Sequence, residues 1–338
     1  MKRFKRKIKS VLISISGILP FSLLQRLASK NPVIINYHSI KGWDPDPIIN
    51  RNTYRSVKQL EDDLRFFKKH FSIVSIADLH HKNKLAQNSL AFTIDDGLKS
   101  VYDLMYPVFN MVGIPAAIFI NPDFADNKDI HFLRKRNLIL KSINSIDEIA
   151  NTELQGWLSK KEISIKQLIS LLEQISYEDR YILDVLILIL RLQNNLINEN
   201  NPVYMTKAEL EIMLKDGFLI GAHSMDHPPF KELTLSEQVK QIKDSIEWVI
   251  KQFQLPYRYF AFPSNDNIIS REVFESIKEE VDLTLGVQGL LSDEYTTHFH
   301  RIEVESTGKS ASQVLKYEYC RYIIKKLVGK SIFKRAND

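Results

Sequence analysis

The chain is poor in cysteine and has no long apolar run. Its 338 residues contain one cysteine, Cys320, which cannot form an internal disulfide, so a disulfide-stapled secreted scaffold is excluded. No apolar run reaches the roughly 20 residues that a membrane-spanning helix needs. Internal repeats and low-complexity segments are also missing. With 44% hydrophobic and 26% charged residues, the composition is typical of a folded globular chain with one large domain or two ordinary ones.

Excess positive charge is missing from the body of the chain. The formal net charge is +5, yet residues 1–10 hold six bases and no acid, and residues 311–338 hold seven bases and two acids. The part between these ends therefore has a net charge of −6. Because a nucleic-acid binder more often carries its bases on the folded face, we expect no nucleic acid as a partner.

Residues 1–30 form a basic and then apolar segment. The basic decapeptide is followed by an apolar stretch from Val11 to Leu24, the order found in a secretion signal. The stretch has no clear small-residue cleavage site, and it is too short to span a bilayer. We expect it to lie on a membrane surface or to cap one end of the domain, with secretion as the alternative. The expected location is cytoplasmic or peripheral to the inner membrane.

The C-terminal residues 311–338 are basic as well. Their lysines and arginines alternate with apolar residues from Tyr322 to Phe333, which predicts a basic amphipathic helix. We expect both ends of the chain to make peripheral contact with an anionic membrane.

The body of the chain, residues 31–310, alternates between short apolar runs and helical spacing. Three capping boxes predict helix starts: Ser56 with Gln59, Thr206 with Glu209, and Thr234 with Glu237. The apolar runs predict strands at 32–37, 89–94, 116–120, 219–222, 258–262 and 283–287. Strands separated by helices in this way indicate βαβ units and an α/β fold with a parallel sheet or barrel.

This alternation is interrupted between about residues 124 and 205. The spacing there is mostly helical, including an apolar run from Tyr181 to Leu192, and we interpret the stretch as a helical insertion. It lies between two predicted site segments, so it can shape a groove, form a lid or bind a partner. The alternative is added packing against the body.

Polar residues follow several of the predicted strands. His38, Asp95-Asp96 and His223 each stand at a strand end. In parallel α/β folds and barrels the carboxyl ends of the strands share one face, and that face holds the active site. We therefore expect these residues to meet.

Two of these strand ends suggest a metal site. Adjacent Asp95 and Asp96 raise each other's pKa unless a cation lies nearby, and a metal on one leaves the other free as a base. His223 and His227 can direct two imidazoles at the same point, and two histidines with one carboxylate are typical of catalytic zinc sites. The alternatives are an Asp-Gly turn and two unrelated surface histidines.

The chain resembles the polysaccharide deacetylases, carbohydrate esterase family four, in three motifs. Phe92–Gly97 resembles the first motif, Gly221–His227 the second and Phe260–Asn265 the third, in the form of one large branch. Ile35–His38 and Met205–Gly217 are similar to further segments of that branch. The resemblance extends over about residues 32–305, interrupted by the insertion.

The resemblance implies a distorted (β/α) barrel that holds one divalent metal, most often Zn²⁺. It implies that Asp96, His223 and His227 are the metal ligands and that Asp95 is the catalytic base. The backbone N–H of Ser264 then helps to hold the oxyanion.

The chain departs from the family pattern in the third and fifth motifs. Ala261 replaces an arginine that pairs with the base, and Arg258 lies three residues too early. Asn265 replaces a glycine. For the general acid of the fifth motif the chain offers His300 or His298. The expected substrate-binding residues are Arg301 (a substitute electrophile), Phe262, Asn265 and His38.

These observations predict a metal-dependent hydrolase that removes N-acetyl groups from N-acetylhexosamine units of a surface polysaccharide or its precursor. Two alternatives remain open: a non-catalytic glycan-binding module on a degenerate barrel, and a hydrolase of a small non-sugar amide. A glycan is the expected partner in the first two cases.

Overall fold

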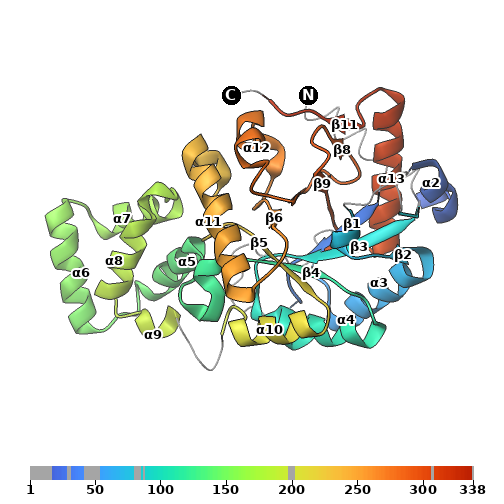
Figure 1. Cartoon of the computed structure of the whole chain (residues 1–338). Helices are drawn as coiled ribbons and strands as arrows, with labels where there is room; N and C mark the ends of the chain where they lie inside the picture. Colours follow the sequence, from blue (N-terminus) through green and yellow to red (C-terminus); the bar gives the residue numbers. More distant parts are fainter. Residues whose placement is uncertain are drawn as a thin grey trace.

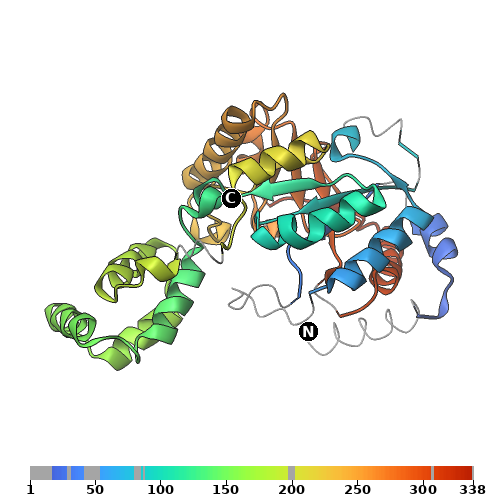
Figure 2. The ribbon, with the colours of Figure 1, turned by 90° about the horizontal axis from the view of Figure 1, so that it is seen from below.

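A computed structural model describes residues 17–28, 32–41, 54–79, 85–86, 88–196, 202–305 and 308–336. A curled sheet lies at the centre of the body, with helices around it (Figure 1). A group of helices from the middle of the sequence projects to one side as an arm, which is clearest from below (Figure 2).

Six neighbouring strands form the parallel centre of the sheet, in the order in which they are listed. They are β1 (Val33–Tyr37), β3 (Ser89–Ile94), β4 (Ala117–Ile120), β5 (Leu219–Ala222), β6 (Tyr259–Ala261) and β7 (Leu283–Gly286). Each agrees with a predicted strand to within about two residues at either end. Every residue of β1 and β3 is buried, which explains why their sequences are continuous apolar runs without alternation.

One extended segment closes the curl of the sheet. Its first half, β9 (His298–His300), pairs with β7, and its second half, β10 (Ile302–Glu303), pairs with β1. Only Arg301 lies between these two short strands. The sheet therefore closes into the distorted (β/α) barrel that the sequence predicts.

Three further strands have only two residues each, and the sequence does not reveal them. β2 (Ser72–Ile73) pairs with β3, β8 (Ser292–Asp293) runs antiparallel to β9, and β11 (Ile332–Phe333) runs parallel to β8. Two residues are too few to show an apolar period.

Helices of the body begin where their caps predict. Complete capping boxes start α3 (Val57–His70), α10 (Lys207–Lys215) and α11 (Leu235–Phe253). Residues 101–112 form a π-helical turn over Val101–Met105 that is followed by α4 (Tyr106–Val112). Pro107 lies in the first turn of α4, where a missing N–H costs no helix hydrogen bond.

The insertion consists of helices with an apolar core of their own. They are α5 (Phe132–Ser142), α6 (Glu148–Lys161), α7 (Ile165–Glu173), α8 (Tyr181–Ile189) and the short α9 (Gln193–Leu196). Buried leucines and isoleucines such as Ile139, Leu154 and Leu183 form this core, which is separate from the core of the body. The arm is thus a small helical unit attached to the barrel.

The two terminal segments pack against each other. α2 (Phe21–Ala28) lies beside α13 (Ala311–Leu327), and α12 (Arg271–Ile277) lies near the last strand (Figure 1). The predicted helix over 311–338 is wrong in its extent, because the chain turns after Leu327 and joins the sheet as β11. The expectations for residues 1–16 and 29–31 lie outside the described residues. Among the residues that the structure describes, no helix is long and apolar enough to cross a membrane.

Candidate functional site

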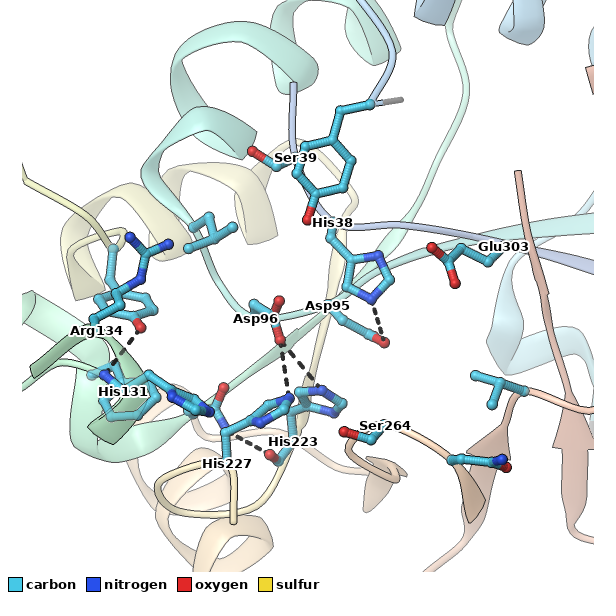
Figure 3. A pocket seen from close by; sticks show the side chains of 17 residues that line it. His38, Ser39, Asp95, Asp96, His131, Arg134, His223, His227, Ser264 and Glu303 are labelled. Carbon is cyan, nitrogen blue, oxygen red and sulfur yellow. Dashed lines mark hydrogen bonds and ion pairs between the residues drawn. The ribbon is translucent and has the colours of Figure 1, made fainter. Parts of the chain in front are cut away.

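A cavity of about 400 Å³ lies at the carboxyl ends of the barrel strands (Figure 3). Its walls include the residues that directly follow β1, β3, β4 and β5, as the strand-end argument predicts. Seven of the predicted site residues line it: His38, Asp95, Asp96, His223, His227, Ser264 and Asn265. The insertion adds His131 and Arg134 to one wall. Sequence analysis did not identify these two residues.

Asp96, His223 and His227 converge in this cavity. Asp96 Oδ1 lies 3.5 Å from Nε2 of each histidine, and the three side chains point toward one another (Figure 3). Asp96 Oδ1 is buried and has no hydrogen-bond partner. Three converging donor atoms, one of them a buried carboxylate oxygen without a hydrogen bond, fit a divalent cation.

The protonation states of this cluster also suit a metal. Burial raises the pKa of Asp96, but the close approach of the His223 imidazole and the charges of His227, His38 and His223 together outweigh it and hold that pKa well below its usual range. Burial lowers the pKa of His227. An ionised carboxylate and a neutral imidazole are the forms that bind metal.

The backbone of the second motif is strained in a way that aims its histidines. Ser224 and His227 have φ of 65° and 56°, which side-chain-bearing residues rarely adopt. Asn121, after β4, donates from Nδ2 to the carbonyls of His223 and Ser224, and His223 Nδ1 contacts Ala261 O at 2.8 Å. Such surrounding contacts maintain strain at functional sites.

The insertion also contacts the loop between the two histidines. The Tyr177 hydroxyl donates to the carboxylate of Asp226, at 2.6 and 2.7 Å from its two oxygens, and Gln241 Nε2 donates to the same group at 2.9 Å. Arg180 lies over the Tyr177 ring, 3.8 Å from its centroid. The imidazole ring of His131 contacts that of His227, with the ring centroids 5.1 Å apart. The arm therefore supports the loop that carries two of the candidate ligands.

Asp95 has an arginine partner, although not at the position of the family motif. Arg301 Nη1 lies 2.7 Å from Asp95 Oδ1, and Asn36 Nδ2 donates to Oδ2 at 3.0 Å. Burial raises the pKa of Asp95, but the charges of Arg301, His223 and His38, together with the hydrogen bond from Arg301, outweigh it, so the net shift is downward. Arg258 instead pairs with Asp282 at 2.8 Å.

Two predicted substrate contacts are therefore corrected. The side chain of Arg301 is fully buried and does not line the cavity, so it orients Asp95 and does not bind substrate. Phe262 is 1% exposed and packs in the core between Phe230 and Phe274. The side chains of Arg301 and Phe262 both lie behind the cavity wall. The spacing of sequence motifs does not show whether a side chain faces the cavity or the core.

The predicted general acids are also misplaced. His298 and His300 are buried in a separate cluster with Asp266 and Asp293, outside the cavity lining. Arg335 reaches this cluster from the C-terminal segment, with Nη2 at 2.7 Å from Asp266 and 2.8 Å from Asp293. The guanidinium of Arg335 therefore balances part of the negative charge of Asp266 and Asp293.

His38 lines the cavity and is paired with a buried carboxylate. Its Nδ1 lies 2.6 Å from Glu305 Oε1, and its Nε2 lies 3.9 Å from Asp95 Oδ2. Burial lowers the pKa of His38, but the charge and hydrogen bond of Glu305 outweigh it and, with Asp96 and Asp95, raise the pKa to about 9. His38 thus carries a proton at neutral pH.

The third-motif loop borders the cavity on the other side. Ser264 has a φ of 56°, whereas Asn265, at the usual glycine position, has an ordinary φ of −112°. The residue with the left-handed backbone is therefore Ser264, one position before Asn265, which replaces the glycine of the family motif. Behind the loop, Asp266 packs against Gly286, where any Cβ would lie 2.3 Å from its carboxylate. Glycine is required there because the approach is so close.

Comparisons with known proteins agree with this geometry. Residues 187–280 match the family model described as "Polysaccharide deacetylase". A search of curated protein sequences finds no match.

Solved structures with a similar fold are deacetylases. The Streptococcus pyogenes deacetylase PplD, in complex with acetate, is 13% identical with a TM-score of 0.53, over 84% of this chain and 97% of that one. IcaB from Ammonifex degensii is 13% identical with a TM-score of 0.51, over 85% and 97%. A de-N-acetylase from Aggregatibacter actinomycetemcomitans is 13% identical with a TM-score of 0.52, over 85% and 99%. The family match and the shared fold confirm the resemblance to the polysaccharide deacetylases.

Proposed function

We propose that this chain, which has the polysaccharide deacetylase fold, is a metal-dependent hydrolase. It removes N-acetyl groups from N-acetylhexosamine units of a surface polysaccharide or its precursor. One observation carries the proposal: an oriented Asp95 lies beside the converging Asp96, His223 and His227 in a single cavity. A general base beside a set of metal ligands is the combination that metal-assisted hydrolysis of an amide uses.

Asp96, His223 and His227 would hold the divalent metal, and this set of two imidazoles and one carboxylate favours Zn²⁺. Such a cation polarises an amide carbonyl and lowers the pKa of water. Asp95 is the general base. Since Arg301 and Asn36 hold its two oxygens, it remains ionised and fixed in direction, ready to accept a proton from the attacking water.

His38 takes the place of the misplaced acids as proton donor. It lines the cavity, lies close to Asp95 and is kept protonated by Glu305. A protonated imidazole at this place can deliver a proton to the departing amine, which leaves acetate and a free amino sugar. Arg301 has no access to that position.

The third-motif loop supplies the remaining polar groups. The backbone N–H of Ser264 is our candidate donor to the oxyanion, as the family resemblance implies, and Asn265 borders the same wall. The cavity volume of about 400 Å³ is within the range of small-ligand sites and suits one acetamido sugar. The aromatic rings of Phe124 and Tyr204 provide an apolar wall.

Acetate release tests the proposal. Purified protein is incubated with oligomers of N-acetylglucosamine and with small acetamides, with and without chelator, and bound metal is measured. We expect release from the oligomers that stops with chelator, and about one metal ion per chain that the chelator removes, as a single-metal catalytic site requires. Asp95→Asn should abolish release and retain the metal, while the exposed Asp62→Asn serves as the matched control.

The other outcomes identify the alternatives. Glycan binding without acetate release in metal-loaded protein contradicts catalysis and favours a binding module. Release from small acetamides alone contradicts the glycan substrate. Full activity of Asp95→Asn contradicts the role given to the base.

A further inference from the structure

A second group of metal-ligating side chains lies behind the third-motif loop, outside the cavity. His298 and His300 stand two residues apart on β9, so their side chains leave the same side of the strand. Asp266 begins the short 3₁₀ turn that follows the loop, and its carboxylate extends toward them. One donor atom from each of these three side chains lies within 4.8 Å of the other two. All three side chains are fully buried.

The spacing of these donor atoms suits a small divalent cation. Asp266 Oδ2 lies 3.2 Å from His298 Nε2 and 3.6 Å from His300 Nδ1. Ligand atoms about 2.0–2.1 Å from a tetrahedral Zn²⁺ lie about 3.3 Å from one another. In the cavity, the distances from Asp96 Oδ1 to its two histidines are both 3.5 Å. The buried group is therefore arranged as closely as the candidate metal centre.

A second polar group lies at the far nitrogen of each histidine. Thr284 Oγ1 makes a hydrogen bond with His298 Nδ1 at 2.8 Å, and Asp293 Oδ2 lies 3.2 Å from His300 Nε2. Groups in these positions orient metal-binding imidazoles. Burial outweighs the hydrogen bond and charge of Asp266 and lowers the pKa of His298 to about 4. The imidazole of His298 is therefore neutral, which is the form that binds metal.

The carboxylate of Asp266 is held on both of its oxygens. Oδ1 accepts a hydrogen bond from the backbone N–H of Val287 at 2.8 Å, and Arg335 Nη2 lies 2.7 Å from Oδ2. The carboxylate reaches the histidines because Gly286, which pairs with His300 between β7 and β9, has no side chain in its way. The single guanidinium of Arg335 faces two carboxylates, so the cluster keeps negative charge that attracts a further cation.

His300 provides an independent observation. Neither of its ring nitrogens makes a hydrogen bond within the described part of the chain, although its side chain has no exposed surface. Buried polar atoms are nearly always paired, and an unpaired one costs free energy. A cation bound to Nδ1 would pair that nitrogen and leave the N–H of Nε2 beside the carboxylate of Asp293.

We propose that Asp266, His298 and His300 form a second divalent-cation site with a structural role. An ion there ties β9 to the third-motif loop, whose residues Ser264 and Asn265 border the cavity. Because its ligands are fully buried, the ion enters as the chain folds, and its release needs a local opening of the barrel. The proposed hydrolysis uses none of the three ligands, so this inference is independent of it.

Metal counting on the full chain tests the site. Protein produced with zinc chloride in the medium is dialysed against EDTA, first folded and then in guanidinium chloride, and zinc is measured by mass spectrometry at each stage. We expect about two ions per chain at the start, one for each site, then about one after the first dialysis and none after the second. Loss of all zinc from the folded chain to EDTA overturns the proposal.

Matched substitutions assign the two ions. His298→Gln/His300→Gln should remove the ion that resists EDTA, whereas Asp96→Asn/His227→Gln should remove only the ion that EDTA takes from the folded chain. His70→Gln changes a histidine outside both groups and should retain both ions. Circular dichroism checks that each variant folds, and the count on the unchanged chain depends on none of them. An EDTA-resistant ion that persists in His298→Gln/His300→Gln contradicts the assignment.

Discussion

At the scale of single residues, the base of the site is held by an arginine that the motif comparison does not locate. The family resemblance places Ala261 at the position of the motif arginine, and Arg258 pairs with Asp282. Arg301 supplies the missing guanidinium from the other end of the sheet. A guanidinium from a different element than the motif position therefore balances the charge of the Asp95 carboxylate in this chain.

Removal of that guanidinium should damage turnover more than binding. In Arg301→Gln, Asp95 loses its main fixed partner, and misplacement of a reacting group by about 1 Å costs on the order of 100-fold in rate. We expect kcat to fall by about that factor while KM and metal content change little. Partial recovery with added guanidinium would distinguish orientation from a folding defect. Arg258→Gln, exposed and paired elsewhere, is the control; an equal loss there contradicts the assignment.

His38 predicts an alkaline limit to activity. Its raised pKa of about 9 means that the protonated donor is present at neutral pH and disappears as the pH rises through about 9. For folding the sign is the same: stabilisation by His38 is complete below its unfolded pKa of about 6.5 and is lost as the pH rises through about 9.

A pH–rate profile measures this limit. Glu305→Gln removes the charge that raises the pKa of His38, so the alkaline limb of kcat should move to lower pH. His38→Gln should lower kcat and remove the limb. A limb that stays in place in both variants would falsify the role of His38 as proton donor.

Sequence motifs located the candidate ligands and the candidate base that line the cavity, but the acids that they suggested lie outside it. Asp95, Asp96, His223 and His227 follow strand ends, so their common location depends only on the sheet topology. Whether His298 or His300 faces the cavity depends on which way a three-residue strand is turned and on what fills the space behind it. Here His298 contacts Asp266, which is paired with Arg335. Neither Asp266 nor Arg335 stands out in the sequence as a residue that fixes the site.

At the scale of elements, the insertion is part of the site's support. Tyr177 and Arg180 contact Asp226, and His131 contacts His227, so the arm is coupled to the ligand loop. The sequence predicted the helices of this insertion from their spacing, and left its role open between a lid, a groove and simple packing. Its contacts with the loop become visible only when the two segments are placed in space.

Loss of one hydroxyl tests this coupling. Tyr177→Phe keeps the ring contacts with Phe132 and Arg180 but leaves Asp226 without its shortest hydrogen bonds. Groups that support metal ligands typically contribute 10- to 100-fold in affinity, so we expect about 10-fold weaker Zn²⁺ binding in competition with a chelator. The exposed Tyr181→Phe should bind like the unchanged chain. Unaltered affinity in Tyr177→Phe contradicts a supporting role for the arm.

At the scale of the whole molecule, the C-terminal segment completes the barrel. Arg335 is buried against Asp266 and Asp293, which stand next to the third-motif loop and on β8. From the sequence we expected these residues in a membrane-facing helix, since composition shows basic character but not which base is buried. Strands of four or more residues were predictable because each carries its own apolar run, whereas β8 and β11 exist only through this contact with distant residues.

Removal of this contact should destabilise the fold. Arg335→Ala leaves Asp266 and Asp293 buried with less positive charge, and breaking a buried ion pair typically costs about 3–5 kcal/mol. We expect a loss of that size in urea-induced unfolding. The neighbouring exposed Lys334→Ala should change stability by less than about 0.5 kcal/mol. Similar losses in the two variants would contradict a specific role for the buried arginine.

Arg301 stands at the single point where the two edges of the sheet come together, between β9 and β10. Its guanidinium can reach Asp95 only after both halves of that segment have docked on their separate neighbours. Closure of the barrel and alignment of the base are therefore one event, and a chain with a misregistered seam lacks the aligned base.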